Sequence, residues 1–311
     1  MTVLGVDCGG TNIKMALVKN NGDIAERALE PVNFRRPAAR AIADIAGRIL
    51  KFKSRMGLSR IPKIGMGIAG EVDSARGLVR FSPNLGWKNV PLKALLAKKL
   101  KSSIHIENDA NCAAWGAFCL DSKRDCNNLI CLTLGTGVGG GIILNKKLYT
   151  GSTGSAGEIG HMTIQHDGRR CGCGNRGCLE SLVGAWGLIQ TAKEGLRRGR
   201  APILKKMLKE EKLSPKLIEA AARKNEPFSK KIWADAGECL GAALSNLANI
   251  FNPDRVVLCG GVSKAGSLLL KPALQALQMR AFETPVKAMK VTVSKYDEKL
   301  GVVGAALLTL E

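Results

Sequence analysis

The chain has 311 residues, of which 45% are hydrophobic and 23% are charged. This length and apolar content exclude an intrinsically disordered chain and allow two domains with buried cores. Lysine and arginine (47) exceed aspartate and glutamate (26) by 21, an excess that suits a polyanion. The basic residues alternate with Ala, Ile and Leu at helical spacing, and no nucleic-acid motif accompanies them. We therefore interpret the charge as solvated helix faces and expect no nucleic-acid partner.

The predicted elements alternate between strands and helices, which indicates an α/β architecture in two lobes. In chain order we expect Val3–Asp7 and Ile13–Val18 (strands), Pro37–Met56 (helix), Ile64–Ile68 (strand), Pro91–Lys99 (helix), Ile104–Glu107 (strand) and Ala110–Phe118 (helix). The pattern restarts with strands at 128–134 and 142–144, helices within 181–248, strands at 255–258 and 290–294, and a final helix at 301–309. Two strand–glycine turn–strand units predict a duplicated structure without an obvious sequence repeat.

No segment has the pattern of a signal peptide or a membrane span, because Val3–Asp7 starts a strand at once. We therefore expect a cytoplasmic protein with no membrane partner. In that reducing compartment, ten cysteines are expected to be free thiols or metal ligands and not disulfides.

Glycine-rich loops follow three of the predicted strands. They are Asp7-Cys8-Gly9-Gly10-Thr11-Asn12, Gly135-Thr136-Gly137 with the glycines after it, and Gly260-Gly261. Glycines let backbone N–H groups approach a phosphate, a threonine adds a hydroxyl donor, and Asp7 could hold Mg²⁺ through water. One such loop alone is equally consistent with a plain hairpin turn. Three together favour a bound triphosphate such as ATP, although no Walker sequence is present.

Asp109 follows a short predicted strand and precedes a predicted helix. A carboxylate there can take the proton of a hydroxyl that attacks a γ-phosphorus. An aspartate at this position can equally cap the helix, and the residues alone leave both interpretations open.

Three cysteines lie within one glycine-rich segment, Cys171-Gly172-Cys173-Gly174-Asn175-Arg176-Gly177-Cys178, shortly after His161. Three thiolates and one imidazole form a normal tetrahedral set for structural Zn²⁺. The alternatives are three reduced thiols in a flexible loop, or a redox pair.

In combination, the Asp7–Thr11 loop, Glu107-Asn108-Asp109-Ala110-Asn111, the Gly135–Gly141 run and the cysteine segment resemble the ROK family of bacterial sugar kinases and related repressors. The resemblance runs from Val3 to about Leu308, and within the family it is closest to the glucokinases. It implies a two-lobed, actin-like ATPase (ribonuclease H-like) α/β fold related to hexokinase, with a structural zinc loop. The implied lobes are residues 1–117 plus 296–311 and residues 118–295, in a homodimer.

The resemblance also implies roles for individual residues. Asp109 becomes the catalytic base, and the metal ligands are His161, Cys171, Cys173 and Cys178. The sugar ligands are Gly70, Asn84, Asn108, Asp109, Glu158, His161 and Glu180. The nucleotide-binding residues are Asp7, Gly9, Gly10, Thr11, Asn12, Lys14, Gly135, Thr136, Gly137, Gly260 and Gly261. The segment around Asn84 has a simpler interpretation as a turn with Trp87 packed beneath it. Two departures from the family pattern are Ala69, where proline is common, and Trp115-Gly116-Ala117 after the catalytic motif.

The implied activity is ATP-dependent phosphorylation of a hexose at its 6-hydroxyl, with glucose expected first and Mg²⁺ as the nucleotide's ion. Kinases for N-acetylmannosamine, N-acetylglucosamine, mannose, fructose or allose remain open. A sugar-sensing regulator is the non-enzyme alternative. Such members carry a helix-turn-helix before the first strand, for which we expect no room here. A degenerate kinase kept as a scaffold is disfavoured, because Asp7, Asp109 and the four metal ligands are present.

Overall fold

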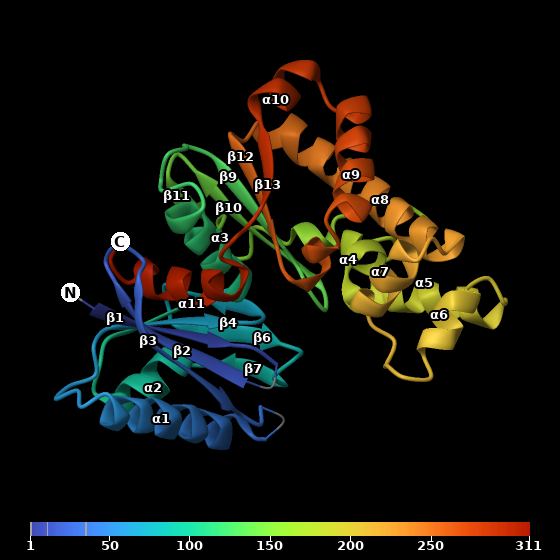
Figure 1. Ribbon diagram of the computed structural model, residues 1–311. Coiled ribbons are helices and arrows are strands. Elements are labelled where there is room, and N and C mark those ends of the chain that lie inside the picture. The colour runs from blue at the N-terminus through green and yellow to red at the C-terminus, as the bar shows by residue number, and fades with distance from the viewer. Residues whose placement is uncertain (1, 11, 35) are drawn as a thin grey trace. The chain divides into compact units, whose positions relative to one another are not determined.

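The computed structural model describes residues 2–10, 12–34 and 36–311, which form two compact units (Figure 1). The first unit comprises Met1–Asn127, Gly141–Gly157 and Lys295–Glu311, and the second comprises Asn128–Gly140 and Glu158–Ser294. These units are defined by their compactness, which is a different property from the lobes predicted from the sequence. The predicted lobes, residues 1–117 plus 296–311 and residues 118–295, therefore stay a prediction.

The first unit is built on a five-stranded sheet with the strand order β3-β2-β1-β4-β8. Its strands are β1 (Thr2–Cys8), β2 (Asn12–Lys19), β3 (Ile24–Pro31), β4 (Ile64–Ile68) and β8 (Ile104–Asn108). β1, β2 and β3 pair antiparallel, whereas β1, β4 and β8 run parallel. The carboxyl ends of these three parallel strands therefore lie at one edge of the sheet.

Helices cover both faces of this sheet (Figure 1). They are α1 (Ala38–Arg55), α2 (Leu92–Leu100), α3 (Asp109–Leu120) and α11 (Asp297–Leu308). α1 packs one apolar stripe into the core, because Ile42, Ile45, Ile49 and Phe52 recur at helical spacing and are buried. On the other face, α11 approaches β4 so closely that a Cβ atom on Gly65 would lie 1.6 Å from a carbonyl oxygen of α11.

A smaller sheet, β5-β6-β7, follows the strand β4. Its strands are β5 (Glu71–Asp73), β6 (Leu78–Ser82) and β7 (Trp87–Val90). Arg80 on β6 pairs with Asp73 at 2.8 Å and donates to the Thr153 carbonyl, and the Ser155 hydroxyl donates to Glu71 at 2.9 Å. These bonds attach the segment before Glu158 to the first unit.

The second five-stranded sheet has the order β11-β10-β9-β12-β13, and the boundary between the units falls within β10. Its strands are β9 (Leu129–Leu134), β10 (Val138–Leu144), β11 (Lys147–Tyr149), β12 (Arg255–Cys259) and β13 (Lys290–Val293). β10 and β11 pair antiparallel, whereas β9, β12 and β13 run parallel. Both sheets thus repeat one pattern, which confirms the predicted duplication. β10 already begins at Val138, so part of the glycine run that we expected to be loop is strand.

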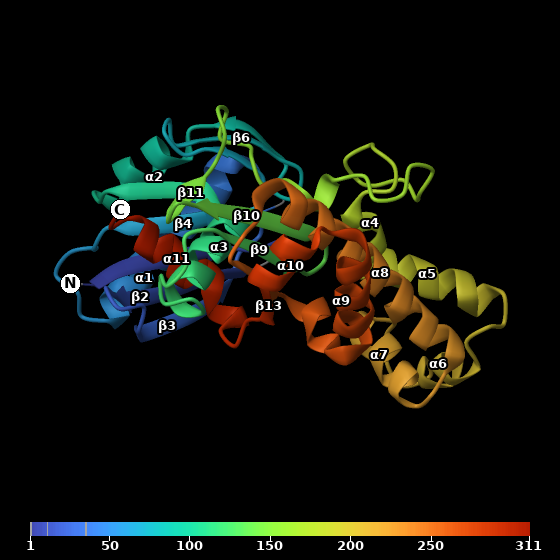
Figure 2. The ribbon, with the colours of Figure 1, turned by 90° about the horizontal axis from the view of Figure 1, so that it is seen from above.

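The helices of the second unit include α8 (Pro227–Phe251) and α9 (Ser267–Arg280), which lie side by side in both views (Figures 1 and 2). The others are α4 (Leu179–Val183), α5 (Ala185–Arg197), α6 (Pro202–Met207), α7 (Pro215–Arg223), α10 (Glu283–Ala288) and the short 3-10 helices Ile159–His161 and Gly261–Ala265. Among the described residues, no helix is both long and apolar enough to cross a membrane.

Candidate active site

Two predicted site carboxylates lie at one edge of the first unit. Asp7 is near the end of β1 and Asp109 follows β8, and both strands run parallel to β4 between them. Burial raises the pKa of the Cys8 thiol, and the negative charges of Asp7 and Asp109 raise it further. Both carboxylates are therefore close enough to Cys8 to act on the same thiol.

Asp109 is the first residue of α3, but the side-chain cap of this helix is Asn108. Asn108 Oδ1 accepts from the N–H groups of Ala110 at 2.8 Å and Asn111 at 3.0 Å, and its Nδ2 donates to the Gly70 carbonyl at 3.0 Å. Asp109 Oδ1 also accepts the Ala110 N–H, at 2.9 Å. The capping interpretation thus belongs to Asn108, and the half-buried Asp109 carboxylate is not required for it.

A buried carboxylate that sequence reasoning did not single out supports this turn. Glu107 is 3% exposed and accepts hydrogen bonds from the Ser74 hydroxyl (2.6 Å), the Asn108 N–H (2.8 Å) and the Asn111 amide (3.0 Å). A buried carboxylate with three donors fixes the groups that donate to it. Glu107 therefore positions the turn that carries Asp109.

The first predicted nucleotide loop is a tight turn between β1 and β2, in which the Gly9 N–H donates to the Asn12 carbonyl at 3.0 Å. Burial raises the pKa of the Asp7 carboxyl, against the opposing effect of Lys14, whose Nζ lies 3.5 Å from Asp7 Oδ2. The exposed Gly10 has open space where a Cβ atom would be. Thr11 lies outside the described residues.

Two predicted sugar ligands flank the small sheet. Gly70 has φ +133°, and a Cβ atom there would lie 2.5 Å from the Phe81 carbonyl oxygen, so no other residue fits this backbone. Asn84 is exposed in a turn, and Trp87 beneath it is 2% exposed, packed edge-on against Phe34 with ring centroids 6.3 Å apart. The turn interpretation of this segment is therefore confirmed, and a sugar contact of Asn84 stays a prediction.

In the second unit, the loop at residues 135–137 has all of its carbonyl groups paired. The carbonyls of Gly135 and Thr136 accept from Ala185 (2.9 Å) and Trp186 (3.3 Å), and that of Gly137 accepts from the Gly135 N–H (2.9 Å). The N–H groups of Thr136 and Gly137 have no partner among the described residues. A loop with paired carbonyls and spare N–H groups is suited to an anion.

The Gly260 loop lies beside this one, because β12 is the parallel neighbour of β9 and a Cβ atom on Gly260 would lie 2.4 Å from the Leu134 carbonyl oxygen. The structure therefore brings together two of the three glycine loops. Gly261 then begins a short 3-10 helix.

The predicted metal ligands form a cluster in the second unit. The ligand atoms of His161, Cys171, Cys173 and Cys178 all lie within 4.8 Å of one another. Cys171 Sγ is 3.8 Å from His161 Nδ1, and Cys173 Sγ is 3.7 Å from Cys178 Sγ. Tetrahedral zinc places neighbouring ligand atoms about 3.6–3.8 Å apart, given its bond lengths to sulfur and nitrogen. These four residues therefore fit a zinc ion.

Two predicted sugar ligands adjoin this cluster. Glu158 Oε2 lies 3.9 Å from His161 Nε2, the ring nitrogen that does not face Cys171. Glu180 Oε1 lies 3.5 Å from Cys171 Sγ, and its Oε2 accepts the Val138 N–H at 3.0 Å.

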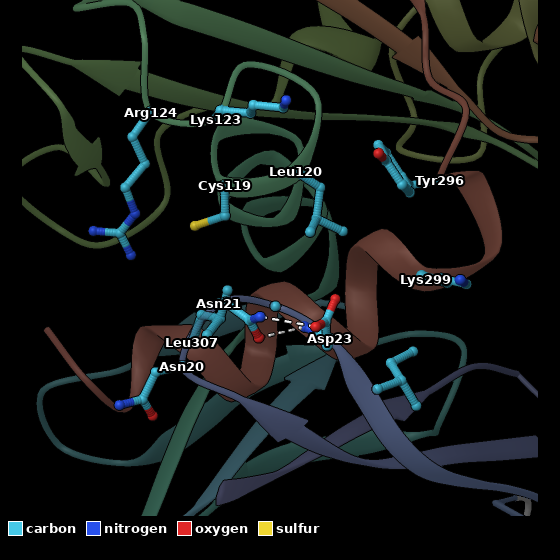
Figure 3. A pocket seen from close by; sticks show the side chains of 12 residues that line it. Asn20, Asn21, Asp23, Cys119, Leu120, Lys123, Arg124, Tyr296, Lys299 and Leu307 are labelled. Carbon is cyan, nitrogen blue, oxygen red and sulfur yellow. Dashed lines mark hydrogen bonds between the residues drawn. The ribbon is translucent and has the colours of Figure 1, made fainter. Parts of the chain in front are cut away.

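A cavity of about 450 Å³ in the first unit is separate from all of these residues (Figure 3). Its lining includes Asn21, Asp23, Cys119, Lys123 and Tyr296, and no predicted site residue is among the described residues that line it.

The chain is similar to known proteins along nearly its whole length. The ROK family model matches residues 3–311. The chain is 35% identical to the glucokinase of Halalkalibacterium halodurans, over 98% of this chain and 94% of that protein. A crystal structure of a ROK family glucokinase from Streptomyces griseus, in complex with glucose and AMPPNP, matches with a TM-score of 0.84 and 32% identity over 99% of each chain.

A regulator also matches, since the chain is 28% identical to the xylose repressor of Caldicellulosiruptor bescii over 99% of this chain and 78% of that protein. The predicted family and α/β sugar-kinase fold class are confirmed by these matches. The chain belongs to the ROK family.

Proposed function

We propose that this protein transfers the γ-phosphoryl group of ATP to the 6-hydroxyl of a hexose, and that the hexose is glucose. The observation that carries the proposal is the Asp109 carboxylate at the start of α3, which the helix does not need as a cap. The glucokinase relative and the glucokinase structure with glucose and AMPPNP support the choice of sugar and donor.

In the proposed reaction, Asp109 accepts the proton of the 6-hydroxyl as its oxygen attacks the γ-phosphorus. Asn108 uses its oxygen and one amide hydrogen within the protein, so its contact with the sugar falls to the second amide hydrogen. Gly70 and Asn84 complete the proposed sugar contacts of the first unit.

Glu158, His161 and Glu180 supply the proposed sugar contacts of the second unit. Carboxylates that accept from several hydroxyls discriminate between sugar epimers, because a misplaced hydroxyl leaves a buried acceptor unpaired. His161 offers its Nε2 to the sugar when its Nδ1 binds the metal.

The glycine loops are the proposed phosphate-binding elements. The N–H groups of Thr136 and Gly137 bind phosphate oxygens, and the loops at Gly9 and Gly260 approach the nucleotide by backbone alone. Asp7 and Lys14 complete this set, and a bound Mg²⁺ ion would neutralise charge on the phosphates.

Zinc is the proposed ion of the Cys/His cluster. Four protein ligands leave no open position for water, so the ion would act as a scaffold for His161 and would not activate a nucleophile. A reducing cytoplasm, in which the ten cysteines stay free, is the proposed location.

A homodimer is the proposed assembly. Ile250, Met279 and Phe282 are 68%, 77% and 76% exposed at the ends of α8 and α9, and the Phe282 N–H donates to Asn249 Oδ1, which places these ends together. An exposed apolar patch of this kind supports a contact with a second copy. Light scattering of the protein and of Phe282→Glu tests this contact.

Steady-state kinetics test the activity, with ADP release measured across a panel of hexoses and zinc content measured on the same sample. We expect the highest kcat/KM for glucose, and a higher value for an amino sugar, mannose, fructose or allose would reassign the substrate. A folded, metal-loaded protein that phosphorylates none of these sugars would overturn the proposal.

The second candidate function is a sugar-sensing regulator, which the xylose repressor match favours. The high net positive charge of 21 is the feature of this chain that suits DNA. Binding to duplex DNA that weakens steeply with salt, together with absent kinase activity, would select this candidate.

A further inference from the structure

We propose that Glu180 is a positioning residue for the glycine loop at residues 135–137, so that one carboxylate connects sugar binding with nucleotide binding. This inference rests on the proposed function, in which Glu180 is a sugar ligand and the loop binds phosphate.

The contacts of Glu180 come from two sides of the second unit. Oε2 accepts the Val138 N–H at 3.0 Å, directly after the loop, and Oε1 lies 3.5 Å from Cys171 Sγ in the metal-binding segment. A hydrogen bond to an ionised carboxylate is roughly twice as strong as one between neutral groups. The Glu180 carboxylate therefore holds the Val138 N–H firmly, and it lies beside the Cys/His cluster.

The loop fits closely around this carboxylate. A Cβ atom on Gly137 would lie 2.1 Å from Glu180 Oε2, so a side chain at residue 137 would displace the carboxylate from its present position. On the other side, a Cβ atom on Gly184 would lie 3.3 Å from both the Gly137 Cα and the Thr136 carbonyl oxygen. The position of the loop is thus set by Glu180 and by the junction of α4 and α5.

This arrangement has a consequence for ligand binding. Val138 directly follows Thr136 and Gly137, the two residues with spare N–H groups. Loss of the hydrogen bond from Val138 to Glu180 therefore lets these two N–H groups move. A carboxylate has about four acceptor positions, which leaves Glu180 able to accept a sugar hydroxyl while it holds Val138. A sugar that restrains Glu180 also restrains the loop, and the coupling must act equally in both directions.

The experiment measures the affinity of AMPPNP with Mg²⁺, in the absence of sugar, by calorimetry. Glu180→Ala is expected to weaken the affinity about tenfold, and Glu180→Gln, whose carbonyl can still accept the Val138 N–H, to change it by less than about twofold. Glu158→Ala is the matched control, because Glu158 is a proposed sugar ligand with no contact to the loop among the described residues. It should weaken glucose binding and leave AMPPNP affinity unchanged.

Hydrogen exchange gives a second readout that does not depend on activity. The peptide containing Val138 should exchange faster in Glu180→Ala than in the wild type, and should be unchanged in Glu158→Ala. If Glu180→Ala does not fold, Glu180→Asp keeps the charge but is one methylene too short to reach Val138, and the same loss of AMPPNP affinity is expected.

Wild-type AMPPNP affinity and unchanged exchange in a folded Glu180→Ala or Glu180→Asp protein would overturn the inference. Failure of the proposed function is recognised separately. In that case the wild type phosphorylates no hexose, whereas the exchange of Val138 still responds to Glu180.

Discussion

Asparagine in place of Asp109 removes a carboxylate and keeps the shape of the side chain. Its Oδ1 can still accept the Ala110 N–H, which lies 2.9 Å from the aspartate oxygen, and the cap provided by Asn108 is untouched. An amide, however, cannot take the proton of a sugar hydroxyl. We therefore expect Asp109→Asn to fold normally and to lose turnover.

The expected loss of turnover in Asp109→Asn is much larger than the expected loss of stability, so the two can be measured separately. Loss of a general base lowers kcat by about 10²- to 10⁴-fold, which corresponds to about 3–5 kcal/mol in the barrier. Loss of one negative charge in the first turn of α3 costs about 0.3–1 kcal/mol of stability, which is a decrease of a few degrees in Tm at most.

The assay is kcat for glucose and ATP, with the melting temperature measured on the same preparation. Asp297→Asn is the matched control, because Asp297 is the first residue of α11 as Asp109 is of α3. It loses the same favourable charge at a helix start and should keep wild-type turnover. Unchanged kcat in Asp109→Asn, or an equal loss in both variants, would refute the assignment of the base.

Three further predictions concern stability and metal. Glu107→Ala leaves three donors without their acceptor and should lower the free energy of unfolding in urea by at least about 3 kcal/mol, whereas Glu107→Gln should cost less. Cys178→Ser should reduce bound zinc, measured by mass spectrometry, from about one ion per chain to near zero, whereas Cys126→Ser, outside the cluster, should keep it. Gly304→Ala puts a Cβ atom 1.7 Å from a carbonyl oxygen of α3 and should lower the free energy of unfolding by about 3 kcal/mol. Gly47→Ala on α1 meets nothing within 4 Å and should raise the free energy of unfolding by up to about 1 kcal/mol. Equal effects of the two glycine variants would contradict the packing argument.

Local patterns explain which elements could be predicted. The amphipathic period of α1 and the apolar run of β4 are visible in short windows, and the structure has both within one residue of the predicted bounds. The strands β3, β5, β6, β7 and β11 were missed, because β3 is largely exposed and the other four are only three to five residues long, too short to show a clear period. β10 begins inside a glycine run because pairing in a sheet overrides the weak strand propensity of glycine.

The candidate site shows the same difference between features visible in a short stretch of sequence and features that depend on the fold. The metal cluster could be predicted because its ligands are close in sequence, so their spacing already limits their geometry. The role of Glu107 could not, because one of its donors is Ser74, 33 residues away, and only the fold brings the two together. Neighbouring Asn108 and Asp109 are both able to cap a helix, and only the hydrogen bonds show which of them does.

The duplication explains why one of two similar aspartates is the stronger candidate for the base. In chain order, β8 leads into α3 and β13 leads into α11, and each helix starts with an aspartate. The first helix has a side-chain cap, Asn108, which also donates from its Nδ2 to the Gly70 carbonyl in another loop. Tyr296, which precedes α11, provides no such cap. A catalytic base must be held by its neighbours within a few tenths of an ångström, so the capped turn favours Asp109 as the base. Asp297, at the corresponding start of α11, is then assigned a structural role.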